Sequence, residues 1–349
     1  MDFHRRLGHV WAVSLPDDLL LAALEARRPL IDEKHEAAFR LFNGFTEGFP
    51  ALALEVYAKT LVVHDHAESP RGDEPAARRA LELVHQQLPW LTAALWKVRH
   101  SENPEERNGR MLLGAEKDLA RKVREHGVWY ALALTLNRDT SLYLDTRALR
   151  LWAKEQLGGK KVLNAFAYTG SLGVAAKAGG ATQVIHTDLK KPFLTVAKDS
   201  YAMNGWPVKK ADFRAGDFFE VMGALKREDT LFDCVFIDPP FLSVTPKGRV
   251  DLETEMPRVL NKARPLVGHG GALVVVNNAV FTSGADFQAV LDAACADGYL
   301  SLDQRLDVPP DFVGYPSTKR GAPLVDPAPF NHSTKIAVLR VKRKDGRAA

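Results

Sequence analysis

The pattern of hydrophobic and polar residues changes near residue 130. Beyond this point, short apolar runs that predict buried strands alternate with segments of helical composition. In the clearest stretch, an apolar run at 162–167, a turn at 168–171, an alanine-rich helix at 172–178 and a second apolar run at 183–186 end in Asp188. Strand, turn, helix, strand and acid in this order are typical of a doubly wound α/β fold that binds a nucleotide.

The same alternation predicts further elements on both sides of this stretch. A hairpin is expected over 128–136 and 140–144 with its turn at 137–139, followed by a helix at 147–157. After Asp188 we expect helix 192–203, strands 209–213 and 232–237, helix 252–266, strand 272–276, helix 287–296 and paired strands at 300–306 and 335–342. The loop between this last pair, 307–334, is long and aromatic, so we expect it to face the substrate as a lid or wall.

Residues 1–130 predict a small α+β domain, and residues 131–349 predict a second domain that carries the α/β pattern. The first domain has expected helices at 19–28 and 76–88, a hairpin at 52–57 and 60–66, a strand at 93–98, turns around 39–50 and a charged loop at 101–110. His64 and His66 share one face of a predicted strand, as two metal ligands would, but no third ligand is evident. We therefore predict no metal site.

Composition narrows the class of protein without identifying it. A chain of 349 residues with 46% hydrophobic and 26% charged residues is typical of a soluble globular protein of about two domains. No apolar run approaches the ~20 residues of a membrane span and no signal peptide is recognisable. The two cysteines exclude a disulfide framework, so a cytoplasmic location is expected. The net charge of +4 permits a nucleic-acid partner without requiring one.

The turn at 168–171 and Asp188 indicate which ligand the fold binds. Backbone N–H groups at a helix N-terminus suit a carboxylate or phosphate, and an acid after the second strand accepts hydrogen bonds from ribose hydroxyls. Only Gly170 and Gly173 of a three-glycine dinucleotide fingerprint are in place, and no P-loop follows the strand. S-adenosylmethionine, which carries ribose and adenine but no phosphate, fits better. An ordinary βαβ unit without a ligand is the alternative.

Two other acidic residues at element ends are candidates for the same site. Asp145 precedes the helix at 147–157 and is either its N-cap or a contact to the cofactor's amino group. Asp217 and Phe218 follow the third predicted strand. There the acid can accept a hydrogen bond from the adenine amine and the ring can pack on the base. A helix cap followed by a core aromatic residue explains the same pair equally well.

The motif Asp238-Pro239-Pro240-Phe241 ends the fourth predicted strand. In an open α/β sheet this end faces the ligand crevice. The acid and a proline carbonyl can accept hydrogen bonds from a base, and Phe241 can stack on that base, as aromatic side chains do with nucleotides removed from a helix. A proline-rich turn would explain the prolines but not the acid and the aromatic residue that flank them.

Taken together, these motifs resemble the large-subunit ribosomal RNA methyltransferase family of bacteria, which contains 5-methylcytosine and N7-methylguanine enzymes. The motifs that carry the resemblance are Tyr143-Leu144-Asp145-x-Arg147, Val162-Leu163-Asn164-x-Phe166-x-Tyr168-Thr169-Gly170, Asp188, Asn204-Gly205, Asp217-Phe218 and Asp238-Pro239-Pro240-Phe241. The resemblance covers most of the chain from about residue 39 onward. It implies a class I, Rossmann-like methyltransferase with a seven-stranded, mostly parallel sheet and a smaller α+β domain before it.

The resemblance also implies how the cofactor is held. Asp145 and Arg147 are expected to bind the methionine end of S-adenosylmethionine. The full set of cofactor-binding residues that the family pattern implies is Tyr143, Asp145, Arg147, Asn164, Phe166, Tyr168, Thr169, Gly170, Asp188, Leu189, Asp217 and Phe218.

Two departures from the family bear on RNA binding and on the target atom. Some members carry an N-terminal PUA RNA-binding domain, but too few residues precede the matched region to form one. The 5-methylcytosine members share a Ser-Cys-Ser after the fifth strand, whose cysteine attacks the base, whereas this chain has Asn277-Asn278-Ala279 there. Cys234, inside the fourth predicted strand, and Cys295, in a helix, do not easily replace it. The Asn-Asn pair resembles the N7-guanine members, and N7 needs no covalent adduct.

We therefore predict an RNA methyltransferase that acts on large-subunit ribosomal RNA or its precursor, with N7 of guanine as the target. The residues expected to orient, stack on and read the base are Asp238, Pro239, Pro240, Phe241, Asn277 and Asn278. The alternatives are methylation of an exocyclic amine or of cytosine C5, a non-catalytic RNA-binding assembly factor, and a protein or small-molecule methyltransferase.

Overall fold

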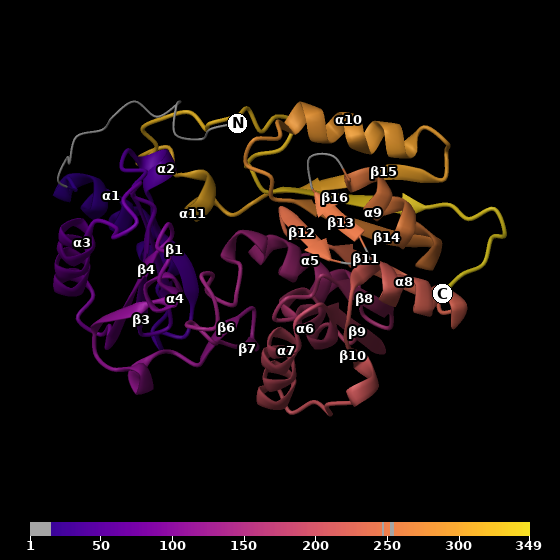
Figure 1. Ribbon diagram of the computed structural model, residues 1–349, viewed down its shortest axis with the longest axis horizontal. Helices are drawn as coiled ribbons and strands as arrows, with labels where there is room; N and C mark the ends of the chain where they lie inside the picture. Colours follow the sequence, from indigo (N-terminus) through magenta and orange to yellow (C-terminus); the bar gives the residue numbers. More distant parts are fainter. Residues whose placement is uncertain (1–14, 246–247, 252–254) are drawn as a thin grey trace.

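The computed structural model describes residues 15–245, 248–251 and 255–349. Two sheets organise it, a five-stranded sheet in the N-terminal part and a seven-stranded sheet in the C-terminal part (Figure 1). Two short two-stranded sheets accompany them. Across the residues described, no helix combines the length and the apolar character that crossing a membrane requires.

The N-terminal sheet has the order β1-β2-β3-β4-β5. Its strands are β1 (Ala38–Asn43), β2 (Leu52–Tyr57), β3 (Thr60–Asp65), β4 (Ala93–Val98) and β5 (Arg110–Leu113). The helices α1 (Asp17–Arg27) and α3 (Glu74–Gln87) pack on one face of the sheet around a shared apolar core. The predicted β2–β3 hairpin is confirmed, and α3 makes the crossover that sets β4 parallel to β3.

Two predictions for this domain are wrong. Residues 39–43 form part of a strand rather than a turn, because Phe39, Leu41 and Phe42 are buried in the core. It leads into the one-turn helix α2 (Gly44–Glu47). The charged segment 101–110 is not a loop throughout, since it contains α4 (Pro104–Asn108) and the start of β5.

The hairpin expected over 128–136 and 140–144 is also wrong. The strand β7 (Val128–Ala131) pairs instead with β6 (Lys122–Glu125). Residues 137 and 139 bind Lys97 of β4 instead of forming a hairpin turn. Lys97 Nζ donates to the carbonyl oxygens of Asn137 and Asp139 at 2.8 and 3.1 Å. The β6–β7 pair packs against the second domain, where Ala131 N donates to Ser200 Oγ at 2.9 Å. Residue 130, where we expected the domain boundary, lies within β7.

The large sheet has the order β10-β9-β8-β11-β14-β16-β15. Its strands in chain order are β8 (Lys161–Ala165), β9 (Gln183–Asp188), β10 (Phe213–Ala215), β11 (Phe232–Ile237), β14 (Val267–Asn277), β15 (Leu300–Leu306) and β16 (Lys335–Val341). The strands from β10 to β14 in the spatial order are parallel to one another, and β16 is antiparallel to its neighbours β14 and β15. This confirms the seven-stranded, mostly parallel sheet and the terminal strand pair.

Helices cover both faces of this sheet, because each buried strand is apolar on both sides. In β8, Val162 joins the core under α5 (Arg147–Gln156), α6 (Ser171–Ala178) and α7 (Lys191–Met203). The next residue, Leu163, joins the core under α8 (Phe218–Arg227), α9 (Met256–Ala263) and α10 (Gly284–Cys295). Residues of β2, β3 and β4 enter the first of these cores, so the two domains share apolar packing.

Three further segments differ from the sequence prediction. The strand expected at 209–213 is a 3₁₀ helix (Lys210–Asp212) followed by β10, because only Phe213–Ala215 reaches the edge of β9. The helix expected at 252–266 begins at Met256 and ends in a 3₁₀ turn, while 252–254 lie outside the described residues. An unexpected hairpin, β12 (Leu242–Thr245) and β13 (Gly248–Asp251), follows the Asp-Pro-Pro-Phe motif.

The segment 307–334 runs from the large sheet to the N-terminal domain, where α11 (Pro310–Val313) lies beside β1 (Figure 1). Asp311 Oδ2 accepts a hydrogen bond from Arg40 N at 2.9 Å, and Asn43 Nδ2 donates to Phe312 O at 2.6 Å. The segment therefore connects the two domains, whereas we expected it to face the substrate as a lid or wall.

Candidate active site

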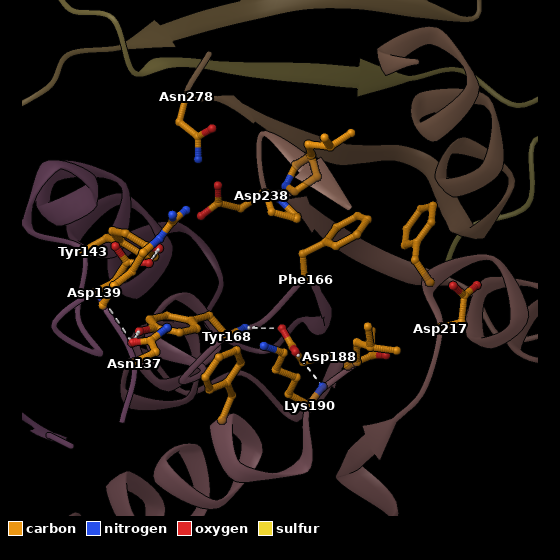
Figure 2. Close-up of a pocket in the computed structure, with 18 of the residues that line it drawn as sticks. Asn137, Asp139, Tyr143, Phe166, Tyr168, Asp188, Lys190, Asp217, Asp238 and Asn278 are labelled. Atoms are coloured by element: carbon orange, nitrogen blue, oxygen red, sulfur yellow. Dashed lines mark hydrogen bonds between the residues drawn. The ribbon is translucent and has the colours of Figure 1, made fainter. Parts of the chain in front are cut away.

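A cavity of about 520 Å³ lies at the carboxyl ends of β8, β9, β10 and β11 (Figure 2). Its volume is in the usual range for small-molecule and cofactor sites. The small domain contributes two residues of α4 to its lining. The residues that line it are Arg107, Asn108, Asn137, Arg138, Asp139, Tyr143, Phe166, Tyr168, Thr187, Asp188, Leu189, Lys190, Phe193, Gly216, Asp217, Phe218, Asp238, Pro239, Pro240, Leu242 and Asn278.

The turn after β8 forms one wall in a strained conformation. Phe166 and Tyr168 have φ values of 54° and 49°, a left-handed conformation that few residues other than glycine adopt. Phe166 stacks on Phe218 with ring centroids 4.5 Å apart, which makes a flat apolar wall. Gly170 has φ 81°, and a Cβ atom there would lie 2.6 Å from the Cβ of Ala197. This glycine is therefore required for the turn to pack against α7.

Asp188 ends β9 and faces the cavity (Figure 2). Its Oδ2 accepts from Tyr168 N at 2.8 Å and its Oδ1 from Lys190 N at 2.9 Å. Burial raises the pKa of this carboxyl group, against the hydrogen bonds that lower it. The two backbone donors fix the orientation of the carboxylate, and each oxygen retains acceptor capacity for a ribose hydroxyl.

Asp217 caps a helix and also lines the cavity. It is the N-cap of α8, and its Oδ1 accepts from Phe219 N at 2.9 Å and from Glu220 N at 3.4 Å. It also lines the cavity together with Phe218. The helix cap therefore places an acidic residue next to the aromatic wall.

Asp238 follows β11, and Pro239, Pro240 and Leu242 line the cavity beside it. Burial and the nearby charge of Asp145 raise the pKa of Asp238 to about 7. Asn278 approaches from the end of β14, and Figure 2 shows its side chain pointing toward Asp238. The Oδ1 atom of Asn278 is buried and has no hydrogen-bond partner within the described residues. A carboxyl group with a raised pKa and an amide oxygen without a partner thus lie in the lining of the same cavity.

The structure gives Asp145 and Arg147 partners outside the cavity. Asp145 Oδ2 accepts from Thr334 Oγ1 at 2.7 Å, and it does not cap α5, whose N-cap is Thr146. Arg147 makes two parallel hydrogen bonds to the Asp311 carboxylate, at 3.0 and 3.1 Å. Neither residue is among the lining residues of the cavity. Both bind residues of the segment 307–334.

Five other predicted site residues also lie outside the lining. Asn164 is buried within β8, with Nδ2 3.5 Å from His186 Nδ1. Thr169 Oγ1 donates to Ser141 O, and Gly170 packs on α7. Asn277 Oδ1 accepts from Ala279 N at 3.0 Å, which shapes the turn that carries Asn278. Phe241 is 44% exposed and is not among the lining residues.

The main site element that sequence reasoning missed is the segment 137–139. Asn137 Oδ1 accepts from Tyr168 OH at 3.0 Å, and Asp139 pairs with Arg99 at 2.8 Å and accepts from Tyr143 OH at 3.1 Å. Its only sequence signal was turn-forming composition, which we interpreted as a hairpin turn. The other lining residues without an assigned role were Arg107, Asn108, Arg138, Thr187, Lys190, Phe193, Gly216 and Leu242.

The cysteines and the paired histidines lie away from this cavity. Cys234 is fully buried in β11, and burial raises the pKa of its thiol, while Cys295 lies in α10. His64 is buried rather than at an exposed edge, and its Nε2 is 3.0 Å from Glu55 Oε2. Within the described ranges, no three His, Cys, Asp or Glu side chains are grouped as metal ligands.

The sheet order, the glycine turn after β8, and acids at the ends of β9 and β11 together define a class I S-adenosylmethionine-dependent methyltransferase. The family described as S-adenosylmethionine-dependent methyltransferase matches residues 39–324, so the chain belongs to this family and uses this cofactor.

Relatives and solved structures agree with this assignment. The chain is 27% identical to ribosomal RNA large subunit methyltransferase I of Photobacterium profundum, over 80% of this chain and 70% of the relative. It is 28% identical to ribosomal RNA large subunit methyltransferase K/L of Colwellia psychrerythraea, over 69% of this chain and 34% of that protein. The fold matches that of the methyltransferase SMU.776 complexed with SAH, with a TM-score of 0.78 and 20% identity, over 95% of this chain and 83% of that one.

Proposed function

We propose that this enzyme methylates N7 of a guanine in large-subunit ribosomal RNA. The substrate class is supported by the names of the relatives, which span both domains of this chain. The observation that carries the choice of atom is that Asn278 and Asp238 both line the cavity, with the Asn278 side chain pointing toward Asp238 and no cysteine among the lining residues (Figure 2).

The lining residues fit S-adenosylmethionine in one orientation. Asp188 would bind the ribose hydroxyls, and Phe166, Leu189 and Phe218 would enclose the adenine beside Asp217. The segment 137–143 would hold the methionine end in place of Asp145 and Arg147, whose side chains have other partners. The cofactor would supply an electrophilic methyl group on a sulfonium, directed toward Asp238 and Asn278.

A nitrogen target follows from the absence of a nucleophile. Carbon-5 of cytosine is methylated only after a thiolate adds to the ring, but Cys234 is sealed in the sheet and Cys295 lies in α10. Guanine N7 already carries a lone pair, so positioning the ring in line with the methyl group suffices. Near neutral pH, the protonated form of Asp238 can donate to O6 of guanine, as can the amide N–H of Asn278.

An exocyclic amine is the second candidate, and the environment of Asp238 favours it. No group in the described part of the chain donates a hydrogen bond to this carboxylate, and no cation pairs with it. In its ionised form it can accept an N–H of an amine and, with a pKa of about 7, can take the proton that leaves after transfer.

The test uses the purified full chain, unmodified large-subunit ribosomal RNA transcribed in vitro, and S-adenosylmethionine with a tritiated methyl group. Nucleoside mass spectrometry identifies the product, and borohydride followed by aniline cleaves the RNA wherever N7 is methylated. We expect N7-methylguanosine. An N2- or N6-methylated purine would select the second candidate, and 5-methylcytidine or no incorporation into RNA would overturn the proposal.

A variant separates the proposed role of Asn278 from general damage. Asn278→Ala should lower kcat/KM for RNA by about 10- to 100-fold, as loss of a charged or polar contact in the transition state does, with the Kd for the cofactor unchanged. Asn261→Ala on the exposed surface of α9 is the matched control. Equal activity of Asn278→Ala and the control would remove Asn278 from base recognition.

A further inference from the structure

Two arginines from separate parts of the chain line the same cavity. Arg107 comes from α4 of the small domain, and Arg138 comes from the segment between β7 and the 3₁₀ helix at Leu144–Thr146. Neither lies within ion-pair distance of a carboxylate among the described residues. Two other arginines of the small domain do have such partners, since Arg99 pairs with Asp139 and Arg110 pairs with Glu74.

The backbone segments that carry the two arginines are both anchored on β4. The helix α4 ends at Gly109, where an added Cβ would lie 2.6 Å from the side chain of Leu95 in β4. Lys97 of β4 binds the segment that carries Arg138, through its hydrogen bonds to Asn137 O and Asp139 O. A pair of cations on a common rigid support is suited to one anionic group.

The position of the pair favours an anion at the mouth rather than at the floor. Arg138 is exposed and Arg107 is half-buried, whereas the acids Asp188 and Asp238 occupy the ends of the strands. The remaining cation in the lining, Lys190, lies beside Asp188 (Figure 2). When a target nucleotide turns into a pocket, its base goes to the floor and its phosphates stay at the rim.

We propose that Arg107 and Arg138 bind a backbone phosphate of the RNA nucleotide that enters the cavity. This rests on the proposed RNA methyltransferase function and extends it to the small domain, which thereby contacts the substrate at the catalytic cavity itself. A guanidinium can place two parallel N–H groups on phosphate oxygens, so each arginine positions as well as attracts the backbone.

The test measures RNA affinity as a function of salt. Unmodified large-subunit ribosomal RNA, labelled with ³²P, is bound to the full-length protein by filter retention between about 50 and 300 mM KCl. Each lost phosphate contact should lower the slope of log Kd against log salt by about 0.7–0.9. Arg107→Ala and Arg138→Ala should each do so and weaken binding on the order of tenfold, whereas Arg107→Lys should keep most of the slope.

Two controls identify what a change means. Arg227→Ala removes an exposed arginine at the C-terminal end of α8, whereas the N-terminal end of this helix lies at the cavity. This variant should leave the slope unchanged. Calorimetric titration with S-adenosylmethionine should give wild-type Kd values for both cavity variants, which also shows that they are folded. If the variants lose cofactor affinity but keep the RNA slope, the arginines bind the cofactor carboxylate and the proposal is overturned.

The remaining outcomes are also decisive. An RNA slope in both cavity variants equal to that of Arg227→Ala would overturn the phosphate assignment while leaving the proposed function intact. A wild-type protein that retains no ribosomal RNA at any salt concentration would refute the proposed function, and this inference with it.

Discussion

Replacing Asp238 by asparagine should stabilise the folded protein at alkaline pH while it impairs methyl transfer. Burial and the charge of Asp145 raise the pKa of this carboxyl group from 3.8 to about 7. When the carboxyl group is protonated in both states, its burial costs no charge. Above the pKa of the unfolded chain the group is ionised when unfolded, so folding must either take up a proton or bury the charge. Its destabilising effect is therefore absent below about pH 4, grows as pH rises, and is constant above about pH 7.

The magnitude follows from the shift. About three pKa units at 1.36 kcal/mol each give about 4 kcal/mol at pH 8, and residual exposure of Asp238 to the cavity reduces this to about 2–4 kcal/mol. Asparagine has nearly the same shape and no charge, so Asp238→Asn should recover most of this amount at pH 8. Between pH 5 and pH 8, the stability difference between variant and wild type should widen by about 2 kcal/mol.

Urea unfolding followed by tryptophan fluorescence at pH 5, 6, 7 and 8 measures this difference. Asp199→Asn, which removes an exposed carboxyl group on α7, is the matched control and should follow wild type at every pH. A stability difference for Asp238→Asn that stays flat from pH 5 to pH 8 would refute the reasoning, because it would mean that Asp238 ionises as easily in the folded protein as in the unfolded chain.

Three further predictions concern the frame around the cavity. Gly170→Ala should destabilise the protein by about 2–4 kcal/mol in urea unfolding, since it adds both backbone strain and a collision with Ala197; a loss below about 0.5 kcal/mol would contradict the packing. Arg147→Met should cost about 3 kcal/mol by leaving the buried carboxylate of Asp311 without its cation, yet keep the calorimetric Kd for S-adenosylmethionine within twofold. A large loss of cofactor affinity would instead support the role implied by the family resemblance. Lys97→Met should remove two hydrogen bonds to the segment 137–139 and raise the KM for the cofactor severalfold, with kcat at saturation nearly unchanged; an unchanged KM would mean that the segment holds its shape alone.

The parts of the fold that local pattern determines could be predicted from the sequence. The run from β8 to β9 has apolar strands of the right length, a glycine at the turn and an acid at the end, so both elements and the position of Asp188 follow. Asp238 and Asn278 could be placed at the cavity for the same reason, since the carboxyl ends of parallel strands lie along one edge of the sheet.

The parts set by distant contacts could not be predicted. The motif around Arg147 suggested a cofactor ligand, but the side chain of Arg147 binds Asp311, which lies 164 residues later in the chain. The segment 137–143 looks locally like a hairpin turn and strand, yet it is shaped by Lys97 and by Tyr57, whose hydroxyl donates to Leu142 O at 3.0 Å. Local propensity gives no information about such partners, so the sequence could not show that the side chains of Asp145 and Arg147 bind Thr334 and Asp311.

The contact between Asp311 and the N-terminal domain joins parts of the chain that are synthesised far apart in time, and it predicts that the enzyme becomes active only late in its own synthesis. Arg40 N and Asp311 are separated by 271 residues, and the buried guanidinium of Arg27 donates to Asp311 O across 284 residues. A growing chain can fold its first sheet early, but these groups lack their partner until nearly all of the protein has left the ribosomal exit tunnel. The cavity is lined both by α4 of the first domain and by Asp238 of the second, so it needs the two domains in place. A nascent chain truncated before residue 311 should therefore remain protease-sensitive where α11 would pack on β1, and it should not transfer methyl groups.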